Sequence, residues 1–335
     1  MNHHAGPFHF LRWLATLLAL LLPLAAGAQA LKIRFAHVVA QDTPKGLAVE
    51  RFKALVAQRS GGRMVVEVYA GSSLYGDRDE MQALQAGAVE MLAPSLSKFG
   101  RVGFPEFELF DLPYLFNDLQ EVHRITDGPL GARLLAGLQR QGMVGLGYLD
   151  NGFKHMSANR PLLRPADYAG LRMRVQASWV IAAQMRALGA VPVALPFGAT
   201  RLALTRQVVN GTENPLSNFW TQGMDRVQSD LTLTGHAYLG YAVVTGQRFW
   251  QSLSNDDRRL LQQAMSDALQ YGNQIADSQN NKALQAIRQA GTTAVHGPSA
   301  EQRERLRAAV LPVHQQLAAR IGEAWLQDAH TALGH

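Results

Sequence analysis

Basic and amide side chains follow several predicted strands of this sequence, at positions where a small anion could be bound. In the segment GLRMRVQ, apolar residues at 171, 173 and 175 alternate with Arg172, Arg174 and Gln176. That alternation is typical of a half-buried strand, and residues 179–188 fit a helix that follows it. A guanidinium at a strand end offers two parallel N–H donors that match the two oxygens of a carboxylate. Arg174 is therefore the first candidate ligand residue, and an ion pair with Asp167 is the structural alternative.

A second group of polar candidates comes from segments near the ends of other predicted strands. In AQDTPKG, Lys45 lies where a helix begins, so an ammonium and backbone N–H groups converge on one point. Such a helix start is suited to an anion. Each member of the group is also compatible with a structural or solvated role. The other members are His37, Ser97, Lys98, Asn151, Lys154, Asn214 and Asn218.

The sequence motifs of common catalytic and cofactor sites are missing from the chain. It contains no HExxH, GxSxG or GxGxxG motif and no Walker lysine loop. His37, His123, His155 and His236 do not fall at metal-ligand spacing, so the sequence predicts no metal and no cofactor. We interpret His155 as a surface or core histidine with satisfied hydrogen bonds. These absences favour a binding protein over an enzyme, and a periplasmic hydrolase is the least favoured alternative.

The elements that must position these residues alternate between strands and helices. This order predicts an α/β fold with an open, mostly parallel sheet and covering helices. After residue 255 the pattern changes, because 256–289 carries an apolar stripe without proline and fits one very long helix or two joined helices. A last helix is expected over 299–333, where SAEQ resembles a capping box. The predicted strands are 31–39, 64–70, 89–95, 143–151, 154–162, 170–176 and 191–195, and the earlier helices are 46–60 and 77–87.

An internal repeat indicates that one arrangement of strands and helices occurs twice in the chain. Residues 83–99 align without gaps with residues 203–219, and both segments end in Ser-x-Phe, at Ser97 and Ser217. Each gives a helix end, a strand and a polar loop, and such loops bind ligands in open α/β sheets. We therefore predict two α/β lobes that face a cleft. The expected boundaries are 31–152 with about 240–280 for lobe I, and 153–239 with about 281–335, including the C-terminal helices, for lobe II.

The N-terminus and the composition indicate export. Residues 1–30 carry Arg12, an apolar run over 13–26 and the small-residue sequence AQA, which together are typical of a signal peptide cleaved near Ala30. The chain has no cysteine, which suits a bacterial periplasm. The formal net charge is +6, with no basic run interleaved with aromatic residues, so a nucleic-acid partner is not expected. An uncleaved membrane anchor is the alternative for the first segment.

Several stretches closely resemble one family over nearly the whole chain after residue 30. They include HVVAQDTPKG, YGDRDEMQALQAGAVEMLAPSLSKFG, GLRMRVQ and GTENPLSNF. The family is that of the solute-binding proteins of TRAP (tripartite ATP-independent periplasmic) transporters, in particular the DctP branch that captures four-carbon dicarboxylates. The resemblance implies a two-lobed periplasmic binding protein fold with a ligand cleft between the lobes and a long helix that links them. It also implies that Arg174 forms a salt bridge with a ligand carboxylate, which Asn214 reaches as well, and that Lys154 and Phe197 belong to the site.

The resulting functional expectation is a monomeric periplasmic receptor that hands an organic acid such as succinate, malate or fumarate to a membrane permease. A second carboxylate could be held by Lys45 with Ser97 and Lys98. A receptor for a monocarboxylate or 2-oxo acid, and a ligand sensor for a membrane signalling partner, are the alternatives. Arg201, Arg206, Asn210 and Ala177 depart from the family pattern beside the site and leave the exact solute open.

Overall fold

Two long antiparallel strands, β4 (Met143–Ala158) and β8 (Asp230–Gly246), run through the centre of one continuous sheet. The computed structural model describes residues 30–334, so the predicted signal peptide lies outside the described residues except for Ala30. The sequence predicts two strands over 143–162, whereas the structure has one strand through residue 158. Register shifts between Gly145 and Gly147, between Asp150 and Gly152, and between Lys154 and Met156 break its alternation of apolar and polar residues.

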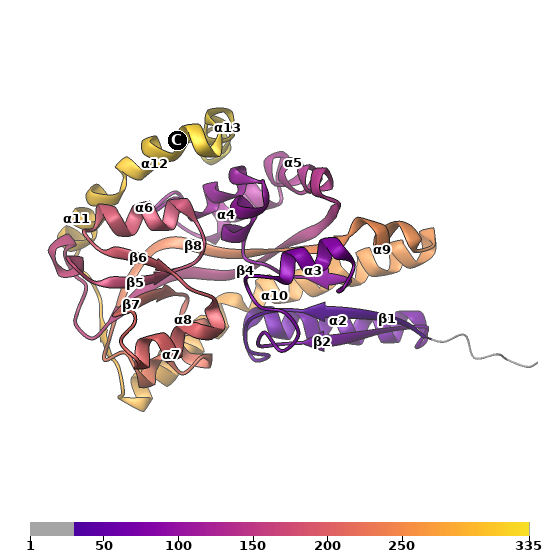
Figure 1. Cartoon of the computed structure of the whole chain (residues 1–335), viewed down its shortest axis with the longest axis horizontal. Coiled ribbons are helices and arrows are strands. Elements are labelled where there is room, and N and C mark those ends of the chain that lie inside the picture. The colour runs from indigo at the N-terminus through magenta and orange to yellow at the C-terminus, as the bar shows by residue number, and fades with distance from the viewer. Residues whose placement is uncertain (1–29, 335) are drawn as a thin grey trace, which may run out of the picture.

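The sheet repeats one plan on either side of this central pair (Figure 1). Its strand order is β2-β1-β3-β8-β4-β7-β5-β6, so each half has a second, first and third strand followed by one long strand. The aligned repeat of the sequence places β3 and β7 in equivalent positions. The expected fold class is confirmed, and most strand pairings are parallel as expected, but β8 is antiparallel to β3 and β4, and β4 is antiparallel to β7. The remaining strands are β1 (Leu31–Ala36), β2 (Met64–Tyr69), β3 (Met91–Leu92), β5 (Arg172–Val175), β6 (Val191–Ala194), β7 (Gly211–Asn214) and β9 (Ala294–His296).

Helices cover both halves and connect their strands (Figure 1). The first, α2 (Pro44–Ser60), begins at the cap residue Thr43, whose hydroxyl accepts the N–H of Gly46. The others in the two halves are α3 (Glu80–Ala86), α4 (Leu119–Thr126), α5 (Pro129–Gly137), α6 (Trp179–Ala187), α7 (Thr200–Thr205), α8 (Leu216–Thr221) and α9 (Gln247–Ser252). Short 3-10 segments, η2 (Leu96–Val102) and η3 (Pro105–Asp111), follow β3.

The long helix α10 (Asn255–Ala290) joins the two halves as a single element. Ser254 caps its start and Gly291, in the left-handed region, ends it. It packs on α2 and β4 in one half and on α8 in the other, so the sequence alternative of one continuous helix is the correct one. None of the helices in residues 30–334, α10 included, combines the length and apolar character needed to cross a membrane.

Three helices replace the single C-terminal helix expected over 299–333. They are α11 (Ala300–Val310), α12 (Pro312–Ile321) and α13 (Glu323–Leu333), separated at Pro312 and Gly322. The capping box at Ser299 is confirmed, because its hydroxyl accepts the N–H of Gln302. Apolar residues of α12 and α13 belong to the same core cluster as η3 and α4. These two helices therefore pack on the first half, while α12 also contacts α6 of the second half, and the expected grouping of residues 281–335 with lobe II stays a prediction.

Gly272 allows α10 to lie close to both α2 and β4. A Cβ at this position would lie 2.8 Å from the Cβ of Ala48 and 2.4 Å from a methyl carbon of Leu149. We expect Gly272→Ala to destabilise the protein, because overpacking costs roughly 1–3 kcal/mol while the gain in helix propensity is about 1 kcal/mol. Urea unfolding measures the net effect. Gly297→Ala is the control, since a Cβ there meets nothing within 4 Å, and equal stability of both variants would contradict the close approach.

A candidate carboxylate-binding site at the strand ends

The candidate site lies at the carboxyl ends of six strands, three from each half of the sheet. A small cavity opens there, between the loops after β1, β2 and β3 and the ends of β5, β6 and β7. Ligands of open α/β sheets bind outside the carboxyl ends of strands, so the repeated topology by itself selects this place. The lining comprises Val38, Val39, Asp77, Ser95, Lys98, Arg174, Gln176, Phe197, Asn214, Asn218, Leu239 and Tyr241.

Arg174 is a buried cation that faces this cavity from the end of β5. It is 2% exposed, and its Nε donates to the carbonyl of Leu195 at 3.0 Å. No carboxylate of residues 30–334 lies within ion-pair distance of its guanidinium. The alternative ion pair with Asp167 is wrong, because Asp167 pairs with Arg164 at 3.0 Å. Burial lowers the pKa of Arg174, against the fields of Asp77 and Glu213. A buried guanidinium of this kind has unused donors for an anionic ligand.

A cluster of three charged residues from the other half of the sheet contributes Asp77 and Lys98 to the lining of the cavity. The ammonium of Lys98, on η2, contacts the carboxylates of both Asp77 and Glu80. Burial alone would lower the pKa of Lys98, but Glu80 and Asp77 outweigh it and the pKa is raised. Asp77 also accepts the backbone N–H of Phe197, from the other half of the sheet. Asp77 was not among the residues expected from the sequence, although its place between a strand and a helix start is a signal that could have identified it.

Neutral polar groups complete the lining. The hydroxyl of Ser95 donates to Oε1 of Gln176 at 2.6 Å, which joins the loop after β3 to the end of β5. Asn214 ends β7 and donates to Thr212 Oγ1 at 3.2 Å. Asn218 is buried, and its Oδ1 has no hydrogen-bond partner within residues 30–334. These amides and hydroxyls are groups that can orient a small polar ligand.

Lys45 and His37 lie behind the cavity wall rather than among its lining residues. The ammonium of Lys45 donates to the carbonyl of Ala93 at 2.9 Å and lies 3.6 Å from the ring centre of Tyr241. Burial, together with the charge of Lys98, lowers the pKa of Lys45 to about 7. Burial likewise lowers the pKa of His37 to about 3, and its ring nitrogens have no partner in the described residues. The Tyr241 ring lines the cavity, so Lys45 contacts a lining residue without being one itself.

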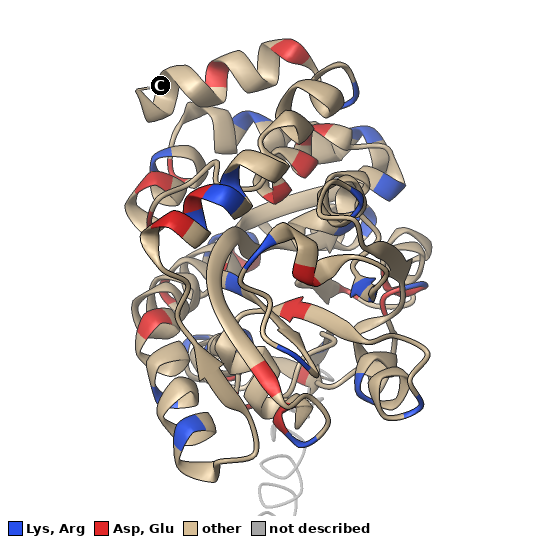
Figure 2. Cartoon of the chain, turned by 90° about the vertical axis from the view of Figure 1, so that its left-hand side faces the viewer, with Lys and Arg blue, Asp and Glu red and all other residues tan. Residues whose placement is uncertain are grey.

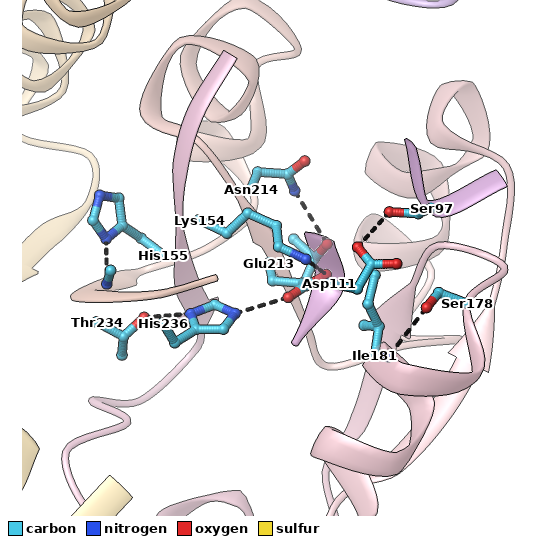
Figure 3. A network of polar contacts seen from close by, with 12 residues as sticks. Ser97, Asp111, Lys154, His155, Ser178, Ile181, Glu213, Asn214, Thr234 and His236 are labelled. Carbon is cyan, nitrogen blue, oxygen red and sulfur yellow. Dashed lines mark hydrogen bonds and ion pairs between the residues drawn. The ribbon is translucent and has the colours of Figure 1, made fainter. Parts of the chain in front are cut away.

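A buried network occupies the sheet next to the cavity (Figure 3). The ammonium of Lys154 contacts Glu213 at 2.8 Å, and the other oxygen of Glu213 lies 2.8 Å from Nε2 of His236. Burial would raise the pKa of Glu213, but Lys154 and His236 outweigh it and hold that pKa at about 2. Lys154 is therefore already paired with a protein carboxylate. Glu213 directly precedes Asn214 on β7, so the network supports the wall of the cavity.

Two more predicted residues have structural partners of their own. The hydroxyl of Ser97 donates to Asp111 Oδ1 at 2.6 Å. Asn151 donates to the Tyr241 hydroxyl at 2.8 Å and accepts from Ser217 at 2.9 Å. The predicted set thus divides into two groups. Arg174, Lys98, Phe197, Asn214 and Asn218 line the cavity, whereas Lys45, His37, Ser97, Asn151 and Lys154 lie behind it. Ligand contact stays a prediction for every member.

Charged residues are interspersed over the rest of the molecule. In the view of Figure 2, Lys and Arg positions alternate with Asp and Glu positions across the helices and strands. The positive formal charge is therefore not gathered on one face in that view. Residues 30–334 contain no cluster of His, Asp and Glu side chains that could hold a metal ion.

Two similar α/β halves with a cavity of this kind between their strand ends define a solute-binding protein. The chain belongs to the bacterial extracellular solute-binding protein family 7, DctP, whose model matches residues 35–321. It is a receptor of the TRAP transporter type.

The chain is similar to proteins whose ligands are known by name. It is 49% identical, over 92% of each chain, to the C4-dicarboxylate-binding periplasmic protein DctP of Rhodobacter capsulatus. A TRAP periplasmic solute-binding protein from Shewanella oneidensis with bound succinate matches with a TM-score of 0.88 at 40% identity, over 91% of this chain and 99% of that chain. One from Pseudomonas aeruginosa with bound L-malate matches with a TM-score of 0.83 at 38% identity, over 85% and 99%.

Asp111, behind the cavity, predicts a pH dependence of stability. Burial raises its pKa from 3.8 to about 6, against the opposing effect of Lys154. A carboxyl whose pKa is raised on folding stabilises the protein at low pH and loses that effect as the pH rises through 6. We therefore expect Asp111→Asn to gain about 2–3 kcal/mol of stability relative to the wild type between pH 4 and pH 8. Urea unfolding at several pH values measures this difference, and a difference independent of pH would contradict the assignment.

Proposed function

We propose that the cleft captures a four-carbon dicarboxylate, with succinate, malate and fumarate as the expected ligands, and delivers it unchanged to a TRAP membrane permease. The observation that carries the proposal is Arg174, a buried guanidinium that faces the cavity without an ion pair in the described chain. Similar proteins that hold succinate and L-malate support this ligand class.

Arg174 is suited to hold the first carboxylate. Its Nε is used by Leu195, which fixes the guanidinium and leaves the terminal N–H donors for the ligand. A carboxylate that accepts two of these donors forms a bidentate pair, which adds orientation to attraction. Asn214 and Asn218 lie in the same lining and provide further polar contacts. The fixed side chain loses little conformational freedom when it binds, so more of the interaction remains as affinity.

The residues around Lys98 indicate where the second carboxylate of the ligand would bind. Lys98 lines the cavity, while Lys45 lies behind Tyr241 and Ser97 is bonded to Asp111. We therefore assign the distal carboxylate to Lys98 and the neighbouring amide and hydroxyl donors rather than to Lys45 and Ser97. Because Lys98 already contacts Asp77 and Glu80, a receptor for a monocarboxylate or 2-oxo acid is the second candidate function.

Closure of the cleft is the step that couples binding to delivery. Hydrogen bonds cross between the halves at Asp77 with Phe197 and at Ser95 with Gln176, and Arg101 donates to the carbonyl of Ala177 at 3.2 Å. We propose that the halves are the two lobes expected from the sequence, and that these contacts belong to the closed form. A ligand that touches both walls would favour this form, since a ligand shifts an equilibrium only by its differential affinity.

The cellular setting follows from the family and from the N-terminal sequence. Family 7 comprises bacterial extracellular solute-binding proteins, and this chain is a periplasmic receptor. We propose that residues 1–30 act as a signal peptide that is cleaved near Ala30. A sensing role for a membrane signalling partner would use the same cleft surfaces, so the permease is the partner we propose on the basis of the family.

Succinate and butyrate distinguish the two ligand classes, because both have four carbons and they differ by one carboxylate. If Lys98 and its neighbours hold a distal carboxylate, succinate should bind more tightly by roughly 2–5 kcal/mol, the cost of losing one buried charge pair. Titration calorimetry with the mature protein measures both affinities, and NMR of the released succinate should show the compound unchanged. Equal affinities would favour the monocarboxylate receptor.

Substitution of Arg174 tests the first carboxylate contact. Arg174→Ala should weaken succinate binding by roughly 2–5 kcal/mol. Arg174→Lys should lose a large part of the same amount, because it keeps the charge without the two-pronged geometry. Arg172→Ala is the matched control on the same strand, where the guanidinium donates to the carbonyls of Gln207 and Val208 away from the cavity. A folded Arg174→Ala protein with wild-type affinity would remove Arg174 from the site.

A further inference from the structure

Asp77 is a carboxylate placed inside a cavity that is otherwise suited to binding a carboxylate. It lies in the loop between β2 and α3, and its side chain is 15% exposed. One oxygen accepts the N–H of Phe197 and the other contacts the ammonium of Lys98. It lines the small cavity and also a wider opening toward Arg78 and Arg101. Asp77 is therefore close to any ligand that enters or occupies the cleft.

The charges on the cavity wall show what Asp77 does to the electrostatic field. Within the described chain, the acidic and basic side chains of the lining are Asp77, Lys98 and Arg174. Lys98 contacts two carboxylates, Asp77 and Glu80, so that cluster carries a formal charge of about −1 when all three groups are ionised. Arg174 thus shares the cavity with a cluster in which the two carboxylates outweigh the charge of Lys98. The positive field available to a ligand is weaker than the number of cations suggests.

This field acts on a ligand in proportion to its charge. A second negative charge on the solute interacts with Asp77 as a like charge, and at a separation of several ångströms such an interaction is substantial in a partly buried site. A neutral N–H or O–H group in the same place instead gains an acceptor. Asp77 therefore disfavours each added anionic charge more than it disfavours a polar neutral group.

We propose that Asp77 is a specificity-determining residue that limits the negative charge of the solute accepted by the cleft. The inference rests on the proposed function, namely that a small carboxylate binds beside Arg174. The backbone contact with Phe197 gives Asp77 a second, structural role as a bridge between the halves. Asparagine keeps a carbonyl oxygen for that bridge and removes the charge, so Asp77→Asn separates the two roles.

The test compares two ligands of nearly the same shape, succinate and its monoamide succinamate, by titration calorimetry on the mature protein. We expect Asp77→Asn to bind succinate about tenfold more tightly than the wild type, as removal of one nearby like charge implies. Succinamate should change less, so the ratio of the two dissociation constants should shift by about tenfold toward the dianion. Asp79→Asn removes an exposed carboxylate from the same loop and should leave both affinities unchanged.

Each other outcome overturns the inference. If Asp77→Asn binds both ligands as the wild type does, Asp77 does not act through its charge. If it binds both more weakly while remaining folded, Asp77 serves the bridge to Phe197, and Asp77→Ala should then weaken binding further. Failure of the proposed function is distinguishable, because the wild type would then bind neither succinate nor succinamate.

Discussion

The burial of a positive charge at Arg174 is the constraint on which the organisation of the site depends. A guanidinium removed from water is costly unless its charge is balanced, and the described chain supplies no ion pair for it. The structure offers partial compensation through one carbonyl hydrogen bond and the fields of Asp77 and Glu213. A ligand carboxylate bound as we propose would complete that balance, and the free energy of binding would then include the relief of an incompletely compensated charge. The same charge in water would bind an anion weakly.

The duplicated topology explains how so many polar groups reach one cavity. In each half, the third strand lies between the first strand and a long central strand, and the loops at the carboxyl ends all open toward the same gap. The strands β4 and β8 pass through both halves and hold them in one sheet, while α10 packs across both. The polar residues of the lining therefore lie in loops, where the sequence alone would suggest exposure to solvent, yet the fold buries them.

The fold class could be predicted from the sequence because it depends on local patterns, and the same patterns led to a candidate site at the strand ends. Alternation located β5 and hence Arg174, and the repeat of residues 83–99 in 203–219 indicated a second, equivalent set of loops. The sequence alone could not distinguish residues that line the cavity from residues that lie behind them. Lys45 and Lys98 have similar sequence contexts, yet the ring of Tyr241, which is more than 140 positions away in the chain, decides that Lys45 is covered. Asp77 was not predicted because an acidic residue is not expected in a site that binds an anion.

The ion pairs behind the cavity show why cations so close together can be kept in one core. Lys154 has Glu213, Lys98 has Asp77 and Glu80, and Lys45 loses part of its charge through a lowered pKa. Lys154 and Lys98 are thus paired with carboxylates of the protein before any ligand arrives, whereas Lys45, which does not line the cavity, has only a carbonyl and a ring contact. Removing one partner of such a buried pair leaves an uncompensated charge, which is strongly destabilising, so these residues are constrained by stability. Arg174 differs because it faces the cavity, so under the proposed function the solute would supply its compensation, and this would separate the residue that recognises the ligand from those that hold the walls around it.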